Sequence, residues 1–123
     1  MSESGTNKPV YDLEERTFLF VRKVRITLRK MKRDALNEDD MVQLINASES
    51  VGANYIEANE SLSKKDFVYR IKICRNESKE SAYWIRVLLE TNVTELSGEL
   101  SFIYNEAIEL KKIFSSVIER SKD

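Results

Sequence analysis

The chain has 123 residues, with 20 lysines and arginines against 21 aspartates and glutamates, and 41% of its residues are hydrophobic. This length and this apolar share fit one folded domain. The chain contains no histidine and one cysteine, which excludes Ser-His and Cys-His catalytic pairs, zinc sites with histidine ligands, di-iron bundles and an intrachain disulfide. We therefore expect no catalytic residue, no metal and no cofactor. The net charge of −1 argues against a wholly basic nucleic-acid-binding protein but leaves local basic patches open.

The N-terminal residues 1–10 are polar and contain Pro9, so we expect them to form a disordered leader. They lack the apolar run of a secretory signal. No stretch of the chain approaches the ~20 consecutive apolar residues that cross a bilayer. We expect a cytoplasmic protein with no membrane partner.

The first two helices are expected at residues 12–35 and 40–60. Asp12 has the position of an N-cap, with Glu15 three residues later as in a capping box. A polar run at residues 37–40 separates the two helices. Apolar residues at helical spacing give the expected inward face of the first helix, which is made of Phe18, Val21, Val24, Leu28 and Met31.

The third and fourth helices are expected at residues 64–90 and 95–120. Ser63, with Asp66 three residues later, has the pattern of an N-cap. Connections of about three to five residues place neighbouring helices antiparallel in a bundle. The sequence therefore predicts an all-α protein, an up-down-up-down antiparallel four-helix bundle over residues 11–121.

A cluster of basic residues without any acidic residue among them is the strongest functional signal. All seven lie on the expected first helix, and Arg22, Arg25, Arg29 and Lys32/Arg33 recur at i, i+3, i+7 and i+10/11, so they form a stripe along one side. Arginine side chains suit phosphate because their rigid fork of donors binds two oxygens together. We predict that the stripe binds nucleic acid; the alternative is a solvated face paired with Glu49, Glu57, Glu77 or Glu80. The cluster consists of Arg22, Lys23, Arg25, Arg29, Lys30, Lys32 and Arg33.

Small residues gather in the middle of the second helix around Gly52. A glycine inside a helix lowers its stability by roughly 1 kcal/mol relative to alanine, so we expect a close approach to another helix there. That helix belongs either to the same protomer or to a second one. Asn54 and Glu57 on the same segment need polar partners if they are buried, and Arg16 is the expected partner of Glu57.

Most of the aromatic residues lie at helical spacing, which is typical of a core; the alternative is a set of stacking platforms for bases. Tyr83 and Trp84 are adjacent and therefore point to different faces of a helix. We expect Trp84 at a subunit contact, where tryptophan is enriched. The aromatic set comprises Phe67, Tyr69, Tyr83, Trp84, Phe102, Tyr104 and Phe114.

Two further kinds of side chain that can carry chemistry are expected to be inert here. Cys74 lies in an apolar context and is expected to be a small buried hydrophobic residue. The carboxylate pairs Glu77/Glu80 and Glu106/Glu109 are expected to be exposed helix charges rather than acid–base catalysts.

Five sequence blocks follow one another in a characteristic order: YDLEERT at residues 11–17, SVGANYIEA at 50–58, DF at 66–67, YWI at 83–85 and EAIEL at 106–110. With these blocks the chain resembles the four-helix-bundle family encoded in intervening sequences of bacterial 23S ribosomal RNA genes. That family is similar to the accessory protein of diversity-generating retroelements. The resemblance implies a ring-shaped homopentamer without catalytic residues. Its subunit interface is expected at Gly52, Asn54, Tyr55 and Trp84.

These observations together predict a non-enzymatic protein that binds RNA or another nucleic acid through the basic residues of the first helix. The alternative is a structural homo-oligomer that binds a protein partner such as a reverse transcriptase.

Overall fold

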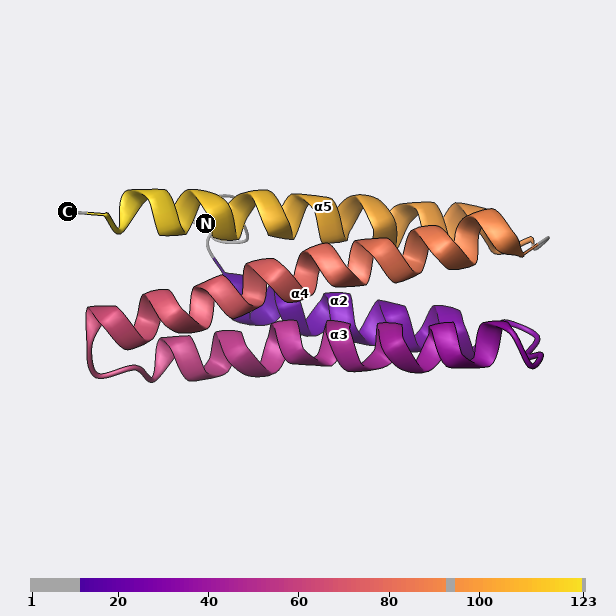
Figure 1. Ribbon diagram of the computed structural model, residues 1–123, viewed down its shortest axis with the longest axis horizontal. Helices are drawn as coiled ribbons and strands as arrows, with labels where there is room; N and C mark the ends of the chain where they lie inside the picture. Colours follow the sequence, from indigo (N-terminus) through magenta and orange to yellow (C-terminus); the bar gives the residue numbers. More distant parts are fainter. Residues whose placement is uncertain (1–11, 93–94, 123) are drawn as a thin grey trace, which may run out of the picture.

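The computed structural model describes residues 12–92 and 95–122. The expected leader at residues 1–10 lies outside them. Within the described ranges there are four helices and no strand: α2 (Leu13–Arg29), α3 (Asn37–Asn59), α4 (Lys64–Thr91) and α5 (Ser97–Arg120). The helices lie side by side along the long axis of the molecule (Figure 1). The prediction of an all-α protein is confirmed.

Each helix packs against two others, and together they enclose one core. α2 contacts α3 and α5, α3 contacts α4, and α4 contacts α5. The end of α3 and the start of α4 lie at the left of Figure 1, whereas the other two junctions lie at the right. None of these helices, over the residues that can be described, is long and apolar enough to cross a membrane. The helices share a set of fully buried side chains that includes Val24, Leu44, Val51, Ile71, Ile85, Leu88, Leu100, Ile103, Leu110 and Phe114.

Two helix starts follow the predicted caps. The Asp12 carboxylate accepts a hydrogen bond from the Glu15 backbone N–H at 3.1 Å. The Ser63 hydroxyl oxygen accepts one from the Asp66 N–H at 3.1 Å. These bonds satisfy N–H groups that have no partner within the first helical turn.

The first helix is shorter than expected, because α2 ends at Arg29 rather than near residue 35. In the segment that follows, the Asp34 carboxylate accepts hydrogen bonds from the backbone N–H groups of Leu36 and Asn37. The Asn37 amide donates to the Lys32 carbonyl and to the Asn92 side chain. These polar side chains replace the helical backbone bonds, and α3 then begins at Asn37, three residues before the predicted start.

The core face of α2 differs in part from the predicted one. Val24 and Leu28 are buried as expected, and so is Met31 just beyond the helix, whereas Val21 is half-buried and Phe18 is 58% exposed. Leu13 and Phe20 are buried in its place, together with Thr17. Since both sets of residues follow helical spacing, the period alone does not distinguish them.

Cys74 is buried as predicted, and its thiol donates a hydrogen bond to the Val51 carbonyl at 3.5 Å. Burial raises the pKa of the Cys74 thiol to about 12. Because the thiolate is the reactive form, we expect negligible alkylation of the folded protein by iodoacetamide at neutral pH. Complete alkylation is expected in urea, and mass spectrometry measures both. Rapid labelling of the folded chain would contradict this expectation.

Candidate nucleic-acid interface

The seven predicted basic residues occupy two kinds of local structure. Arg22, Lys23, Arg25 and Arg29 lie on α2, and Lys30 is its C-cap. Lys32 and Arg33 lie in the connection before α3. The predicted stripe along one helix therefore ends at Arg29. The last two residues are brought beside it by the hydrogen-bonded connection rather than by helical spacing.

Three of the seven residues form ion pairs with neighbouring helices. Arg25 pairs with Glu49 of α3 at 2.5 Å, which is one of the predicted partners. Lys23 and Lys30 both pair with Glu99 of α5. The Lys23 Nζ lies 3.9 Å from Glu99 Oε1, and the Lys30 Nζ lies 3.2 Å from Glu99 Oε2. Glu99 was not among the expected partners. These pairs fix part of the cluster to the bundle surface.

The other four residues, Arg22, Arg29, Lys32 and Arg33, are exposed. Within the described part of the chain, none of the four has a carboxylate oxygen within 4.0 Å. Their sequence neighbours at three and four residues include no aspartate or glutamate. Carboxylates at those positions are the ones that would neutralise a helical cation. These four positive charges are therefore available to an external anion.

Three arginines line a shallow hollow on the α2–α3 surface with a volume of about 210 Å³. Arg25 and Arg29 come from α2 and Arg33 from the connection, and the hollow is also lined by the apolar side chains of Leu28 and Ile45. We call this feature the arginine hollow. Guanidinium groups beside an apolar surface interact more strongly with an anion than they would in bulk water.

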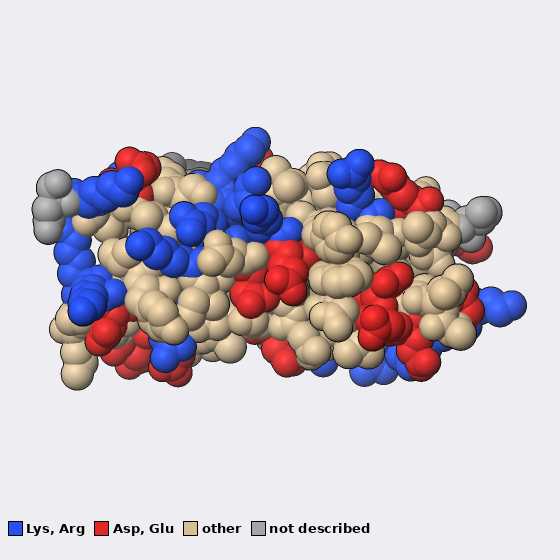
Figure 2. All heavy atoms as spheres, viewed as in Figure 1, with Lys and Arg blue, Asp and Glu red and all other residues tan. Residues whose placement is uncertain are grey.

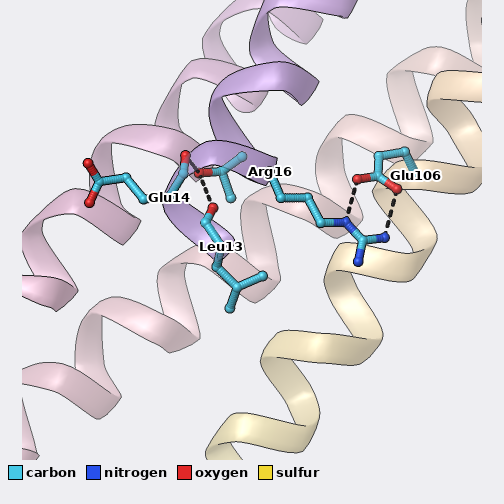
Figure 3. A network of polar contacts seen from close by, with 5 residues as sticks. Leu13, Glu14, Arg16 and Glu106 are labelled. Carbon is cyan, nitrogen blue, oxygen red and sulfur yellow. Dashed lines mark hydrogen bonds and ion pairs between the residues drawn. The ribbon is translucent and has the colours of Figure 1, made fainter. Parts of the chain in front are cut away.

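The predicted pairing of Arg16 with Glu57 is wrong. The Arg16 guanidinium lies on Glu106 of α5, with Nε 2.7 Å from Oε2 and Nη2 2.9 Å from Oε1 (Figure 3). Glu57 is exposed instead. The hydrogen bond to Glu106 raises the pKa of Arg16. This bidentate pair joins α2 to α5, the least extensive of the helix contacts, and Glu106 is therefore not a free surface charge.

The residues expected at a subunit interface make contacts within the chain. A Cβ atom at Gly52 would lie 3.4 Å from Val21 Cγ2, so this glycine brings α3 close to α2. Tyr55 packs against Phe114 with ring centroids 6.1 Å apart. Asn54 accepts a hydrogen bond from Arg70 at 2.9 Å.

Trp84, the fourth expected interface residue, is partly buried, and its ring meets that of Tyr83 in a T-shaped contact, with centroids 4.9 Å apart. Its indole N–H is buried without an acceptor among the described residues. Tyr83 itself is exposed, as are Tyr69 and Phe102. The expectation that the aromatic residues belong to the core is therefore wrong for these three, whereas Phe114 is fully buried.

An apolar groove lies between α2 and α3, with a volume of about 540 Å³. Phe18 and Val21 line it from α2, and Gly52, Ala53 and Ile56 line it from α3. Phe18 and Ile56 are 58% and 50% exposed. The small residues at positions 52 and 53 leave this apolar groove open. The sequence signal for this groove was the group of small and apolar residues Gly52, Ala53 and Ile56 on one helix, together with the apolar residues Phe18 and Val21 on another.

Glu77 is partly buried on α4, and this burial raises its pKa, with a further contribution from Glu80. The folded protein then holds the Glu77 proton more tightly than the unfolded chain, so folding stability falls as pH rises above about 4.5 through the folded pKa. Glu77→Gln is therefore expected to raise the free energy of unfolding at pH 7 and to flatten its fall with pH. Urea titrations at several pH values test this, with Glu60→Gln on the surface as control. Identical pH profiles for the wild type and Glu77→Gln would contradict it.

Comparison with known proteins gives the family. Residues 12–116 match the 23S rRNA-intervening sequence protein family. The chain belongs to this family. A crystal structure of a protein with unknown function from the S23 ribosomal protein family of Bacteroides thetaiotaomicron is similar, with a TM-score of 0.71 and 25% sequence identity. The similarity covers 85% of this chain and 96% of that chain. No curated protein shows significant similarity.

Proposed function

We propose that this member of the 23S rRNA-intervening sequence protein family binds RNA without catalysing a reaction. The observation that carries the proposal is the group of four exposed cations without carboxylate partners, among the described residues, on α2 and the connection after it. Two of them, Arg29 and Arg33, line the arginine hollow together with Arg25. Arginine and lysine are the main side chains that contact nucleic-acid phosphates. Arg22 and Lys32 extend the positive surface on either side of the hollow along the chain.

Arg29 and Arg33 would bind phosphate oxygens directly, since neither is engaged by a carboxylate among the described residues. Arg25 would exchange its bond to Glu49 for a phosphate or share it. Contacts of this kind release counterions from the nucleic acid, so the affinity falls steeply as salt is added. They position the RNA backbone and carry little sequence information.

Fluorescence anisotropy with a labelled RNA hairpin tests this function. We expect the logarithm of the association constant to fall linearly with the logarithm of salt concentration between about 50 and 200 mM, with a slope near −0.9 per phosphate contact. Absence of binding at the lowest salt, or binding that does not depend on salt, would contradict the proposal.

A second candidate function is a homo-oligomeric scaffold for a protein partner such as a reverse transcriptase. The apolar groove between α2 and α3 favours it, because exposed apolar surface of this kind is typical of interaction sites. We propose an up-down-up-down bundle, supported by where the helix junctions lie in Figure 1, and a ring of protomers, for which the family resemblance suggests five. Cytoplasmic location is part of the same proposal.

Light scattering tests the assembly. We expect a mass several times the 14.3 kDa of one chain, and we expect Phe18→Glu to reduce it to the mass of a protomer while the helical circular dichroism is retained. A charge in the apolar groove is unfavourable when a partner covers it. A wild-type monomer at micromolar concentration would contradict the ring.

A further inference from the structure

We infer that the outer face of α4 is a second nucleic-acid surface, which binds a single-stranded segment by stacking bases on Tyr69 and Tyr83. These two rings lie fourteen residues apart, about 21 Å along the helix. Both are exposed, by 61% and 59%. Lys72, Arg75 and Lys79 lie between them in the sequence. We call these five residues the α4 strip.

The five residues fall on one side of α4. From Tyr69, the steps to Tyr83, Lys72 and Lys79 are fourteen, three and ten residues, which place them about 40°, 60° and 80° to one side of Tyr69 on a helix with 3.6 residues per turn. Glu80 lies about 20° to the other side and borders this face. Arg75 lies at the edge of this face. It borders a groove of about 400 Å³ that runs beside Lys72 and is closed on the other side by α5. Figure 2 shows basic side chains gathered on the left half of the viewed face, over the adjoining parts of α4 and α5.

The three cations of the α4 strip have no carboxylate partner in the part of the chain that the structure describes. No aspartate or glutamate stands three or four residues from any of them. Elsewhere on α4 and α5, the bundle pairs its cations at this spacing, as in Arg86 with Glu90 and Lys112 with Glu109. The cations of the strip are thus unpaired among the described residues, although Glu80 borders the strip and offsets part of its positive charge.

The two tyrosine rings are held in place by neighbouring side chains. The Arg70 guanidinium lies 5.8 Å from the Tyr69 ring centroid, and Arg70 is itself hydrogen-bonded to Asn54. Tyr83 is held by its T-shaped contact with Trp84. Rings that are already oriented lose less freedom when a base stacks on them. A base adds stacking energy to phosphate binding regardless of its identity.

A single-stranded nucleic acid fits this strip better than a protein does. Lysine is depleted at protein interfaces, whereas the strip holds two lysines between its rings. A double helix would present phosphates to the cations but no free base to the tyrosines. The α4 strip is separate from the arginine hollow on α2, so the inference about the strip does not depend on the proposed function.

The test uses a labelled oligouridylate as the probe and the whole chain. Tyr69→Ala/Tyr83→Ala is expected to weaken binding by about tenfold or more, while Tyr69→Phe/Tyr83→Phe retains it because phenylalanine keeps the ring. Lys72→Gln/Arg75→Gln is expected to reduce the salt slope by about 1.4. The charge-matched control, Lys112→Gln/Arg120→Gln, alters other exposed cations of α5 and is expected to leave the slope unchanged.

Trp84 supplies a readout confined to this surface, because it is the single tryptophan of the chain and touches Tyr83. We expect oligouridylate to change Trp84 fluorescence in the wild type and in Arg22→Glu/Arg29→Glu. An unchanged Trp84 signal at saturation, wild-type affinity in the tyrosine-to-alanine variant, or equally tight competition by polyglutamate would overturn the inference. A loss of hairpin binding that is confined to Arg22→Glu/Arg29→Glu concerns the arginine hollow and not the α4 strip.

Discussion

Phe114→Ala is expected to lower the free energy of unfolding by about 3–5 kcal/mol. The Phe114 side chain is fully buried on α5 and packs against Tyr55 of α3. It also belongs to the same apolar core as Ile103 and Leu110. Removing the ring leaves a cavity that four packed helices fill only in part. Since a domain of this size is stable by about 5–15 kcal/mol, the loss is a large part of the total.

Urea unfolding followed by helical circular dichroism measures this change. Phe102→Ala is the matched control, because it makes the same substitution on the same helix at a residue that is 62% exposed. It is expected to change the free energy of unfolding by no more than about 0.5 kcal/mol. Similar losses in the two variants would show that Phe114 is not a central core residue.

Arg22→Glu/Arg29→Glu is expected to weaken binding of the RNA hairpin about a hundredfold at about 0.1 M salt. Two phosphate contacts contribute a salt slope of about −1.8, so they raise the affinity nearly a hundredfold between 1 M and 0.1 M salt. The two new carboxylates also repel the RNA phosphates. Both arginines are exposed and have no ion pair among the described residues. The substitutions therefore remove charge without opening an internal contact.

Lys112→Glu/Arg120→Glu changes the net charge by the same amount and serves as the control. Lys112 pairs with Glu109 of its own helix, and Arg120 donates to Ser116. Anisotropy titrations are expected to show a much smaller loss of affinity for this variant. Equal losses would mean that net charge, rather than the α2 cluster, governs binding.

The composition of the candidate site was predictable, and so was Glu49 as one possible partner, but the pairing with Glu99 was not. The seven basic residues stand out in the sequence because no acid interrupts them. Their ion pairs with Glu49 and Glu99 depend on which helices are neighbours, and these lie far away along the chain. The α4 strip had a readable signal, namely cations without carboxylates at three or four residues. The exposure of Tyr69 and Tyr83 required the structure, since their helical spacing is the same as that of core residues.

The sequence by itself determined the helical class, the family and two of the helix starts. Capping bonds at Asp12 and Ser63 join residues only three apart, so local sequence decides them. Tertiary structure decided which side of α2 faces inward. Phe18 and Phe20 are both apolar, and only the positions of α3 and α5 bury the second and expose the first. The Arg16–Glu106 pair has the same origin, because its two residues are ninety positions apart and meet only where α2 packs on α5. Helical periodicity is a local property, whereas the choice among faces and partners follows from packing between distant segments.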